Sequence, residues 1–128
     1  TVLVSGDTAK SANLQQFAQG VDLLVHDALA PNLVGVMHDT ATKVGATGLA
    51  KITLDIQNYH ASPVEAAEVA RDANVGHLLY YHIVPPLILP GMEAALQSLC
   101  RALQFNGKPT MSIRRLQSSR SHRPAVRR

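Results

Sequence analysis

The 128-residue sequence is poor in cysteine, in long apolar runs and, over its last 28 residues, in acidic side chains. Its one cysteine, Cys100, excludes an internal disulfide and a CxxC metal site, and it leaves open whether the protein is cytoplasmic or periplasmic. No stretch reaches the roughly 18 to 20 apolar residues that a bilayer helix needs. The first residues also lack the basic start and long apolar run of a signal peptide. The sequence therefore predicts no membrane span.

The absence of Asp and Glu from residues 101–128 divides the chain into two parts of opposite net charge. Residues 101–128 contain eight of the twelve Lys and Arg residues and no acid, whereas residues 1–100 contain all nine acids and four bases. The net charge of +3 is therefore the sum of −5 over residues 1–100 and +8 over residues 101–128, and the basic character belongs to the tail. We expect one folded domain over residues 1–106 and a basic, disordered tail over residues 107–128, because the tail shows almost no apolar periodicity.

Short apolar runs alternate with helical patterns along the folded part. Strands are predicted over residues 1–5, 22–26 and 77–81. Helices are predicted after Ser11 as far as Gly20, over residues 28–43, from Ser62 to about residue 73, and over residues 92–103. Gly45 and Gly48 are expected to bracket a loop, and residues 49–57 fit either a helix or an extended segment. This order predicts an α/β fold with a largely parallel sheet and covering helices.

The clearest local signal is Ser62-Pro63-Val64-Glu65. It places a capping serine, a proline at the first helical position and a glutamate three residues after the cap. This pattern is a capping box and predicts the start of a helix.

Polar residues follow the predicted strands, where open α/β sheets form ligand sites. Asp7 follows the first strand, His26 and Asp27 close the second, and His82 closes the third before Pro85-Pro86. His60 lies in the loop before the capped helix and could reach the same edge. Asp and His suit zinc or manganese, although a catalytic zinc normally has about three protein ligands.

Four segments together resemble a known family. They are Gly6-Asp7-Thr8, Asp22-Leu23-Leu24-Val25-His26-Asp27-Ala28, His60-Ala61-Ser62-Pro63-Val64-Glu65-Ala66-Ala67 and Leu78-Leu79-Tyr80-Tyr81-His82-Ile83-Val84-Pro85. In this order and at this spacing they resemble the C-terminal half of the metallo-β-lactamase superfamily, in the branch of ribonuclease Z and its arylsulfatase-like relatives. The resemblance extends over roughly residues 1–96. It implies one sheet, with its covering helices, of an αββα sandwich.

The resemblance implies a role for each matching residue. Asp7 matches the aspartate that bridges two metal ions, and His82 matches the final histidine ligand of one of them. His60 resembles the histidine that protonates or stabilises the leaving oxygen. Asp27 replaces the glutamate that orients this histidine. The implied cofactors are two Zn²⁺ ions, with Mn²⁺ as an alternative.

The HxHxDH motif of the family is absent from the sequence. We therefore expect a fragment of a longer metal-dependent hydrolase, inactive alone, that acts on phosphodiester bonds in RNA or on sulfate esters. Loss of one half of the sandwich would also expose an apolar sheet face and favour self-association. The alternative function is a non-catalytic interaction or RNA-binding module that uses the basic tail.

The same residues also have structural interpretations. Asp7 could be a turn residue, His60 could hydrogen-bond the helix entrance, and Asp27 could cap a strand end. His82 could pack against the loop that follows it. Three histidines and the cysteine are expected to be structural or solvated: His26, His38, His77 and Cys100. The arginines near the end of the tail also suit an unselected terminus, because no aromatic residues lie between them.

Overall fold

The computed structural model describes residues 1–86 and residue 91. The strands are β1 (Val2–Val4), β2 (Leu23–Leu29) and β3 (His77–Val84). The helices are α1 (Ala12–Phe17), α2 (Pro31–Lys43), α3 (Thr47–Asp55), the 3₁₀ turn η1 (Ile56–Asn58) and α4 (Pro63–Asp72). The expected α/β class is confirmed. The predicted last helix, Cys100 and the basic tail lie outside the described residues.

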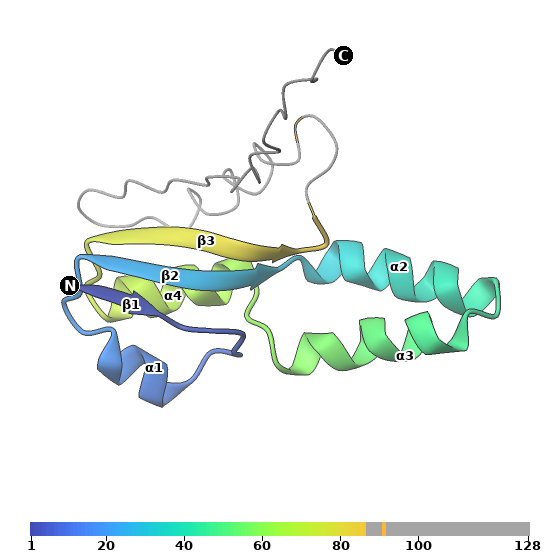
Figure 1. The fold of residues 1–128 in the computed structure, drawn as a ribbon, viewed down its shortest axis with the longest axis horizontal. Helices are drawn as coiled ribbons and strands as arrows, with labels where there is room; N and C mark the ends of the chain where they lie inside the picture. Colours follow the sequence, from blue (N-terminus) through green and yellow to red (C-terminus); the bar gives the residue numbers. More distant parts are fainter. Residues whose placement is uncertain (87–90, 92–128) are drawn as a thin grey trace, which may run out of the picture.

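The three strands form one parallel sheet in the order β1-β2-β3 (Figure 1). The predicted ends of two strands were wrong. β2 continues past His26 to Leu29, and β3 continues past Tyr81 to Val84. Ala28 and Leu29 pair with Ile83 and Val84, so each segment extends the other. Ile83 and Val84 are β-branched, which favours a strand, whereas the extension of β2 depends on its pairing with these two residues.

A bulge interrupts the β2–β3 pairing beside the candidate site. Asp27 pairs with Tyr81, but Ala28 pairs with Ile83, so His82 has no partner in the register. His82 has a φ of 44°, a left-handed conformation that is uncommon for residues other than glycine. It therefore does not end β3, as the sequence predicted, but lies in a bulge within it.

Local chemistry explains where the helices begin. The Ser11 side chain accepts a hydrogen bond from the Leu14 amide, and Ser62 forms the predicted capping box with Glu65. The predicted start of α2 at residue 28 was wrong, because Pro31 opens the helix while Ala28 and Leu29 belong to the sheet. A turn is present at Gly45, but the expected loop does not reach Gly48, because α3 begins at Thr47.

The ambiguous segment 49–57 is helical. Gly48 and residues up to Asp55 lie in α3, and the turn η1 follows directly. The alternation of isoleucine and leucine that suggested an extended segment has no paired strand to support it, so the helical spacing prevails.

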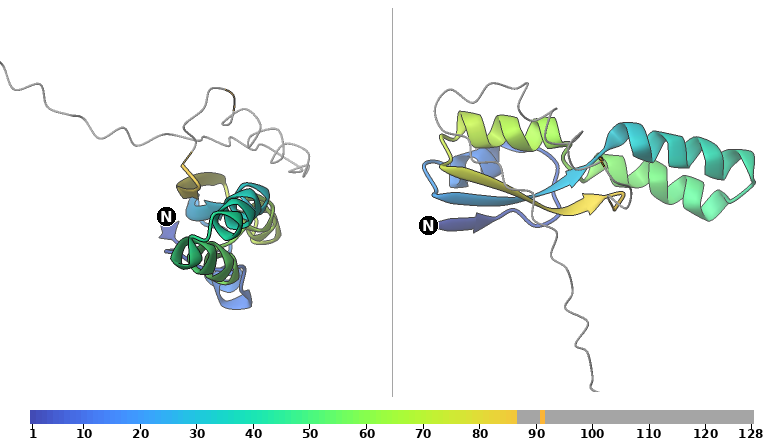
Figure 2. Two further views of the ribbon diagram at one scale, coloured as in Figure 1. Left: turned by 90° about the vertical axis from the view of Figure 1, so that its right-hand side faces the viewer. Right: turned by 90° about the horizontal axis from the view of Figure 1, so that it is seen from above.

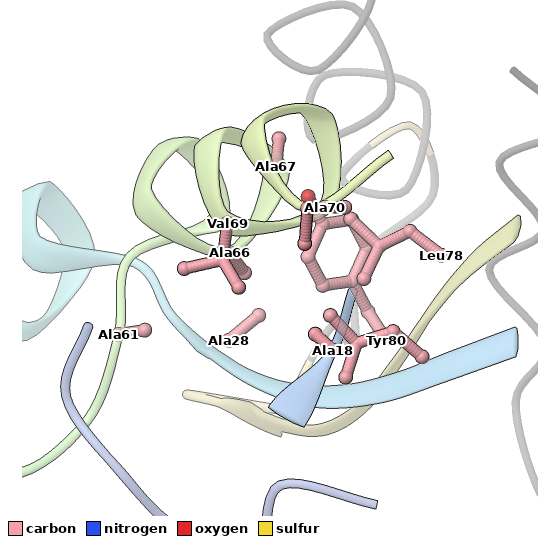
Figure 3. Packing of buried hydrophobic residues seen from close by; sticks show 11 residues of the cluster. Ala18, Ala28, Ala61, Ala66, Ala67, Val69, Ala70, Leu78 and Tyr80 are labelled. Carbon is pink, nitrogen blue, oxygen red and sulfur yellow. The ribbon is translucent and has the colours of Figure 1, made fainter. Parts of the chain in front are cut away.

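The core lies between the sheet and α4. Ala66, Ala67 and Ala70 of α4 are buried against Tyr80 and its neighbours on the sheet (Figure 3). Alanine side chains let the helix lie close to the strands, and the Tyr80 hydroxyl donates a 2.7 Å hydrogen bond to the Pro63 carbonyl oxygen. This bond ties β3 to the start of α4, directly beside the loop that carries His60.

Helices α2 and α3 form an antiparallel pair that extends beyond the end of the sheet (Figure 2). The pair is joined by His38 of α2, whose Nδ1 lies 2.9 Å from the Ala50 carbonyl oxygen of α3. Among the described residues, no helix combines the length and the apolar character that a membrane span requires.

Helices α1 and α4 lie on one face of the sheet, and none of the helices in residues 1–86 covers the other face (Figure 1). Leu3 of β1 packs against the core, whereas its neighbours Val2 and Val4 remain 65% and 59% exposed. Val2 pairs with Leu23, and Val4 pairs with Val25. The uncovered face is therefore apolar along β1 and β2. We call the four residues Val2, Val4, Leu23 and Val25 the open sheet face.

Candidate functional site

The candidate residues come from four different elements. Asp7 lies in the loop after β1, Asp27 lies within β2, His60 precedes the cap of α4, and His82 lies in the bulge of β3. Gly6 has a φ of 69° and turns the chain directly before Asp7. The sheet is parallel, so the carboxyl ends of its strands share one edge, and the four segments meet there.

Three of these side chains form one cluster. His82 Nε2 lies 3.7 Å from Asp7 Oδ2, and one ligand atom from each of Asp7, His60 and His82 lies within 4.8 Å of the others. The rings of His60 and His82 are stacked with their centroids 5.4 Å apart. Asp7 and His82 are about half exposed, whereas His60 is buried. The predicted meeting of Asp7 and His82 is therefore observed.

The buried carboxylate of Asp27 holds His60. Its Oδ2 lies 2.7 Å from His60 Nδ1, so the shorter aspartate side chain still makes the contact expected of a glutamate. Burial acts to raise the pKa of Asp27, but the imidazoles of His26 and His60 beside its two carboxylate oxygens outweigh it and hold that pKa below its ordinary value. Asp27 is therefore an ionised acceptor that keeps a proton on His60 Nδ1. Asp27 lies inside β2, so the structural interpretation that it caps the end of a strand was wrong.

The other histidines have separate environments. His26 is fully buried beside Asp27, as a structural residue would be. His77 is exposed at the start of β3, with its Nδ1 3.3 Å from the Asp22 carbonyl oxygen. His38 belongs to the helix pair described above.

Tyr81 is a site residue that the sequence pattern did not single out. Its hydroxyl donates a 3.4 Å hydrogen bond to Asp7 Oδ1. Burial raises the pKa of the Tyr81 phenol, and the negative charges of Asp7 and Asp27 add to the effect. In the sequence, only its position next to His82 pointed to a role in the site. Both side chains reach Asp7 because the bulge interrupts the alternation of side chains along β3.

The donor set fits a divalent metal ion. A carboxylate oxygen and imidazole nitrogens are ligands that zinc and manganese accept. With bonds of about 2 Å, the ligands of a tetrahedral zinc lie about 3.3 Å apart. The Asp7–His82 separation of 3.7 Å is close to this value, and both side chains are exposed enough to adjust.

Comparison with known proteins gives a consistent result. No family model matches the sequence. Ribonuclease Z of Mycobacterium tuberculosis strain H37Rv is 35% identical over 108 residues, which cover 84% of this chain and 35% of that protein. Ribonuclease Z of Mycobacterium sp. strain KMS is 36% identical over 94 residues, which cover 73% of this chain and 29% of that protein. The chain thus spans less than half the length of the curated relatives it matches.

A solved structure shows the same fold. The crystal structure of the metallo-β-lactamase fold protein YhfI from Bacillus subtilis matches 88% of this chain and 36% of its own, with a TM-score of 0.55 and 19% identity. Sequence and fold comparisons agree on the superfamily. The chain belongs to the metallo-β-lactamase superfamily of metal-dependent hydrolases, in which it corresponds to a C-terminal portion related to ribonuclease Z.

Proposed function

We propose that this chain carries part of a dinuclear metal site and the proton donor of a hydrolase that cleaves phosphodiester bonds in RNA. The observation that carries the proposal is the cluster of Asp7, His60 and His82, with His60 held from behind by Asp27. The structural interpretations treat Asp7 as a turn residue, His82 as a loop-packing residue and His60 as a helix-entrance residue. They do not explain why these three side chains lie together.

Asp7 and His82 are the proposed metal ligands. When bound there, divalent zinc or manganese ions would supply Lewis-acid activation of a phosphoryl or sulfuryl oxygen and of water near neutral pH. The two side chains offer an oxygen and a nitrogen 3.7 Å apart. They are fewer than the ligands that two ions require. Because residues 1–128 contain no HxHxDH motif, we propose that the chain does not hydrolyse substrate by itself.

His60 is the proposed general acid, and Asp27 is its positioning residue. Asp27 accepts from Nδ1, which leaves Nε2 of the ring to carry the proton that is transferred to the leaving oxygen. A positioned acid of this kind contributes about 10² to 10⁴ to the rate.

RNA is the preferred substrate class because the relatives named above are ribonucleases Z. Sulfate esters are the alternative, since a sulfuryl group presents the same tetrahedral arrangement of oxygens to the metal ions.

The test is hydrolysis by the protein as its gene encodes it, with any sequence that precedes Thr1. We expect bound zinc or manganese and cleavage of an RNA phosphodiester, both lost in Asp7→Ala. Cleavage should fall by about 10² to 10⁴ in His60→Ala while the bound metal is retained. Asp39→Ala, an exposed position on α2, is the control. Cleavage of an aryl sulfate but not of RNA would reverse the order of the substrates, and unchanged activity in Asp7→Ala would contradict the proposal.

The charge of the tail supports a second candidate function. Eight bases and no acid lie in residues 101–128, beyond the described residues, so an RNA-binding or interaction module is the alternative. This function predicts RNA binding by the 128-residue chain that weakens steeply with salt and disappears when residues 107–128 are deleted. Binding that survives the deletion would exclude the tail as the binding element.

A further inference from the structure

The buried imidazole of His26 has no role in the function proposed so far. Its side chain and that of Asp27 are fully buried, next to each other on β2. Among the residues that the structure describes, His26 Nε2 has no hydrogen-bond partner. A buried polar atom without a partner carries a desolvation cost that an apolar side chain of similar size would avoid. Packing alone therefore does not account for a histidine here.

The other ring nitrogen of His26 is directed at Asp27. Nδ1 lies 3.0 Å from the Asp27 carbonyl oxygen and 2.8 Å from its carboxylate oxygen Oδ1. In the described part of the chain, Oδ1 has no hydrogen bond of good geometry. The proton on Nδ1 is thus aimed mainly at the carbonyl, and its contact with Oδ1 is electrostatic.

The Asp27 carboxylate therefore lies between two imidazoles. His60 Nδ1 lies 2.7 Å from Oδ2, and His26 Nδ1 lies 2.8 Å from Oδ1. The hydrogen bond from His60 fixes one oxygen of the carboxyl group, and the electrostatic contact with His26 favours the same orientation from the other side. Rotation of the carboxyl group would weaken both contacts. The lowered pKa of Asp27 agrees with donors on both sides.

We propose that His26 is a positioning residue that acts through Asp27. Its Nδ1 proton holds the carboxylate in the orientation that keeps the proton of His60 on Nδ1 and leaves Nε2 of His60 available to the cluster of Asp7 and His82. In this chain of contacts, His26 contacts Asp27, Asp27 contacts His60, and His60 lies beside the proposed metal ligands. The catalytic meaning of this chain of contacts rests on the proposed function, whereas the hold on His60 is a property of the structure itself.

The test uses nitrogen-15 NMR of the histidine rings in the metal-free, 128-residue chain. In the unsubstituted protein, His26 is expected to carry its proton on Nδ1, and the Nδ1 proton of His60 is expected to be protected from exchange with water. A proton on His26 Nε2 alone would overturn the proposal. This measurement needs no variant, so it decides even if substitutions at His26 prevent folding.

Three substitutions then separate position from packing. His26→Asn keeps an amide N–H where Nδ1 lies, His26→Gln moves the amide N–H toward the place of Nε2, and His26→Leu removes both. We expect the exchange of the His60 Nδ1 proton to accelerate at least about tenfold in the Gln and Leu variants and to stay within about twofold in the Asn variant. His77→Leu, at an exposed histidine of the same sheet, is the control.

Equal behaviour of the Asn and Gln variants would contradict the positioning role, and so would a folded Leu variant with an unchanged His60 signal. The outcome is independent of the proposed hydrolysis. Loss of RNA cleavage with an intact His60 signal would bear on the metal ligands, whereas an altered His60 signal in an enzyme that never cleaves RNA would leave the His26 contact standing.

Discussion

The site depends on individual residues in unusual conformations. His82 has a φ of 44° in the bulge of β3. This left-handed backbone conformation is unfavourable for any residue other than glycine. The bulge carries the imidazole to within 3.7 Å of Asp7. Strained backbone of this kind persists where the surrounding sheet holds it, and it is concentrated at functional sites.

A first prediction at this scale concerns metal binding. In His82→Ala the affinity of the chain for Zn²⁺ or Co²⁺, measured by calorimetry, should fall at least about tenfold, because one of few ligands is removed. His77→Ala removes an exposed histidine of the same strand and should leave the affinity unchanged. Equal losses in both variants would mean that the ion binds to surface histidines in general.

A second prediction concerns pH. The folded-state pKa of Asp27 lies below the unfolded value of about 3.9, so its contribution to stability is fully present above that pH and is lost as the pH falls through the folded-state pKa. Asp27→Asn should therefore lower the free energy of unfolding by about 1.5 to 3 kcal/mol at neutral pH. The difference from the unsubstituted chain should shrink below about pH 4.

Denaturant unfolding at a series of pH values measures this difference. Asp39→Asn, at an exposed position, serves as the control. A difference between Asp27→Asn and the unsubstituted chain that stays constant down to pH 2 would show that the carboxylate charge is not what stabilises the contact.

At the scale of elements, α4 links the core to the site. Its alanines let it lie close to the sheet, the Tyr80 hydroxyl donates a hydrogen bond to the carbonyl oxygen of its first residue, and His60 lies two residues before its cap. The capping box is closed in both directions: Glu65 accepts a 2.8 Å hydrogen bond from the Ser62 amide, and the Ser62 hydroxyl accepts a 3.2 Å hydrogen bond from the Glu65 amide. The entry of the chain into α4 is thereby determined, and with it the direction of the His60 loop.

Removing this cap should affect both stability and the site. Ser62→Ala is expected to lower the free energy of unfolding by about 1 kcal/mol and to shift the NMR signals of His60. Ser11→Ala removes the cap of α1 and should cost a similar amount, but it should leave His60 unchanged because α1 does not carry the site. A His60 signal that moves in neither variant would mean that the core, and not the cap, directs the loop.

At the scale of the whole molecule, the sheet is covered on one face by α1 and α4, and the open sheet face presents Val2 and Val4 largely to solvent. An apolar surface of this kind favours association with another apolar surface. The helix pair α2–α3 lies apart from it, beyond the end of the sheet (Figure 2).

We therefore expect the chain to self-associate with increasing concentration, as measured by sedimentation velocity. Val4→Lys should shift the distribution toward monomer, because it places a charge within the open sheet face. Val44→Lys is the matched control, since Val44 is 72% exposed but lies at the end of α2. A monomer at all concentrations would exclude association through this face, and an equal response to both lysines would indicate a general effect of charge.

Local signals predicted much of this chain. The alternation of apolar runs and helical patterns gave the order of strands and helices, and the starts at Ser11 and Ser62 followed from capping chemistry within a few residues. The convergence of Asp7, His60 and His82 was also predicted, because polar side chains at the carboxyl ends of parallel strands meet at one edge, whereas Tyr81 was not singled out.

What the tertiary structure decided depends on residues that are distant in sequence. The extension of β2 to Leu29 requires β3 beside it, the bulge at His82 is a mismatch between two strands, and the contacts of Asp27 with His60 and of Tyr81 with Asp7 exist only once four elements are in place. Caps and helical periodicity act over one or two turns of the chain, so the sequence by itself determines them. Register, backbone strain and the position of His26 beside a buried carboxylate are properties of paired and packed elements, which no single segment encodes.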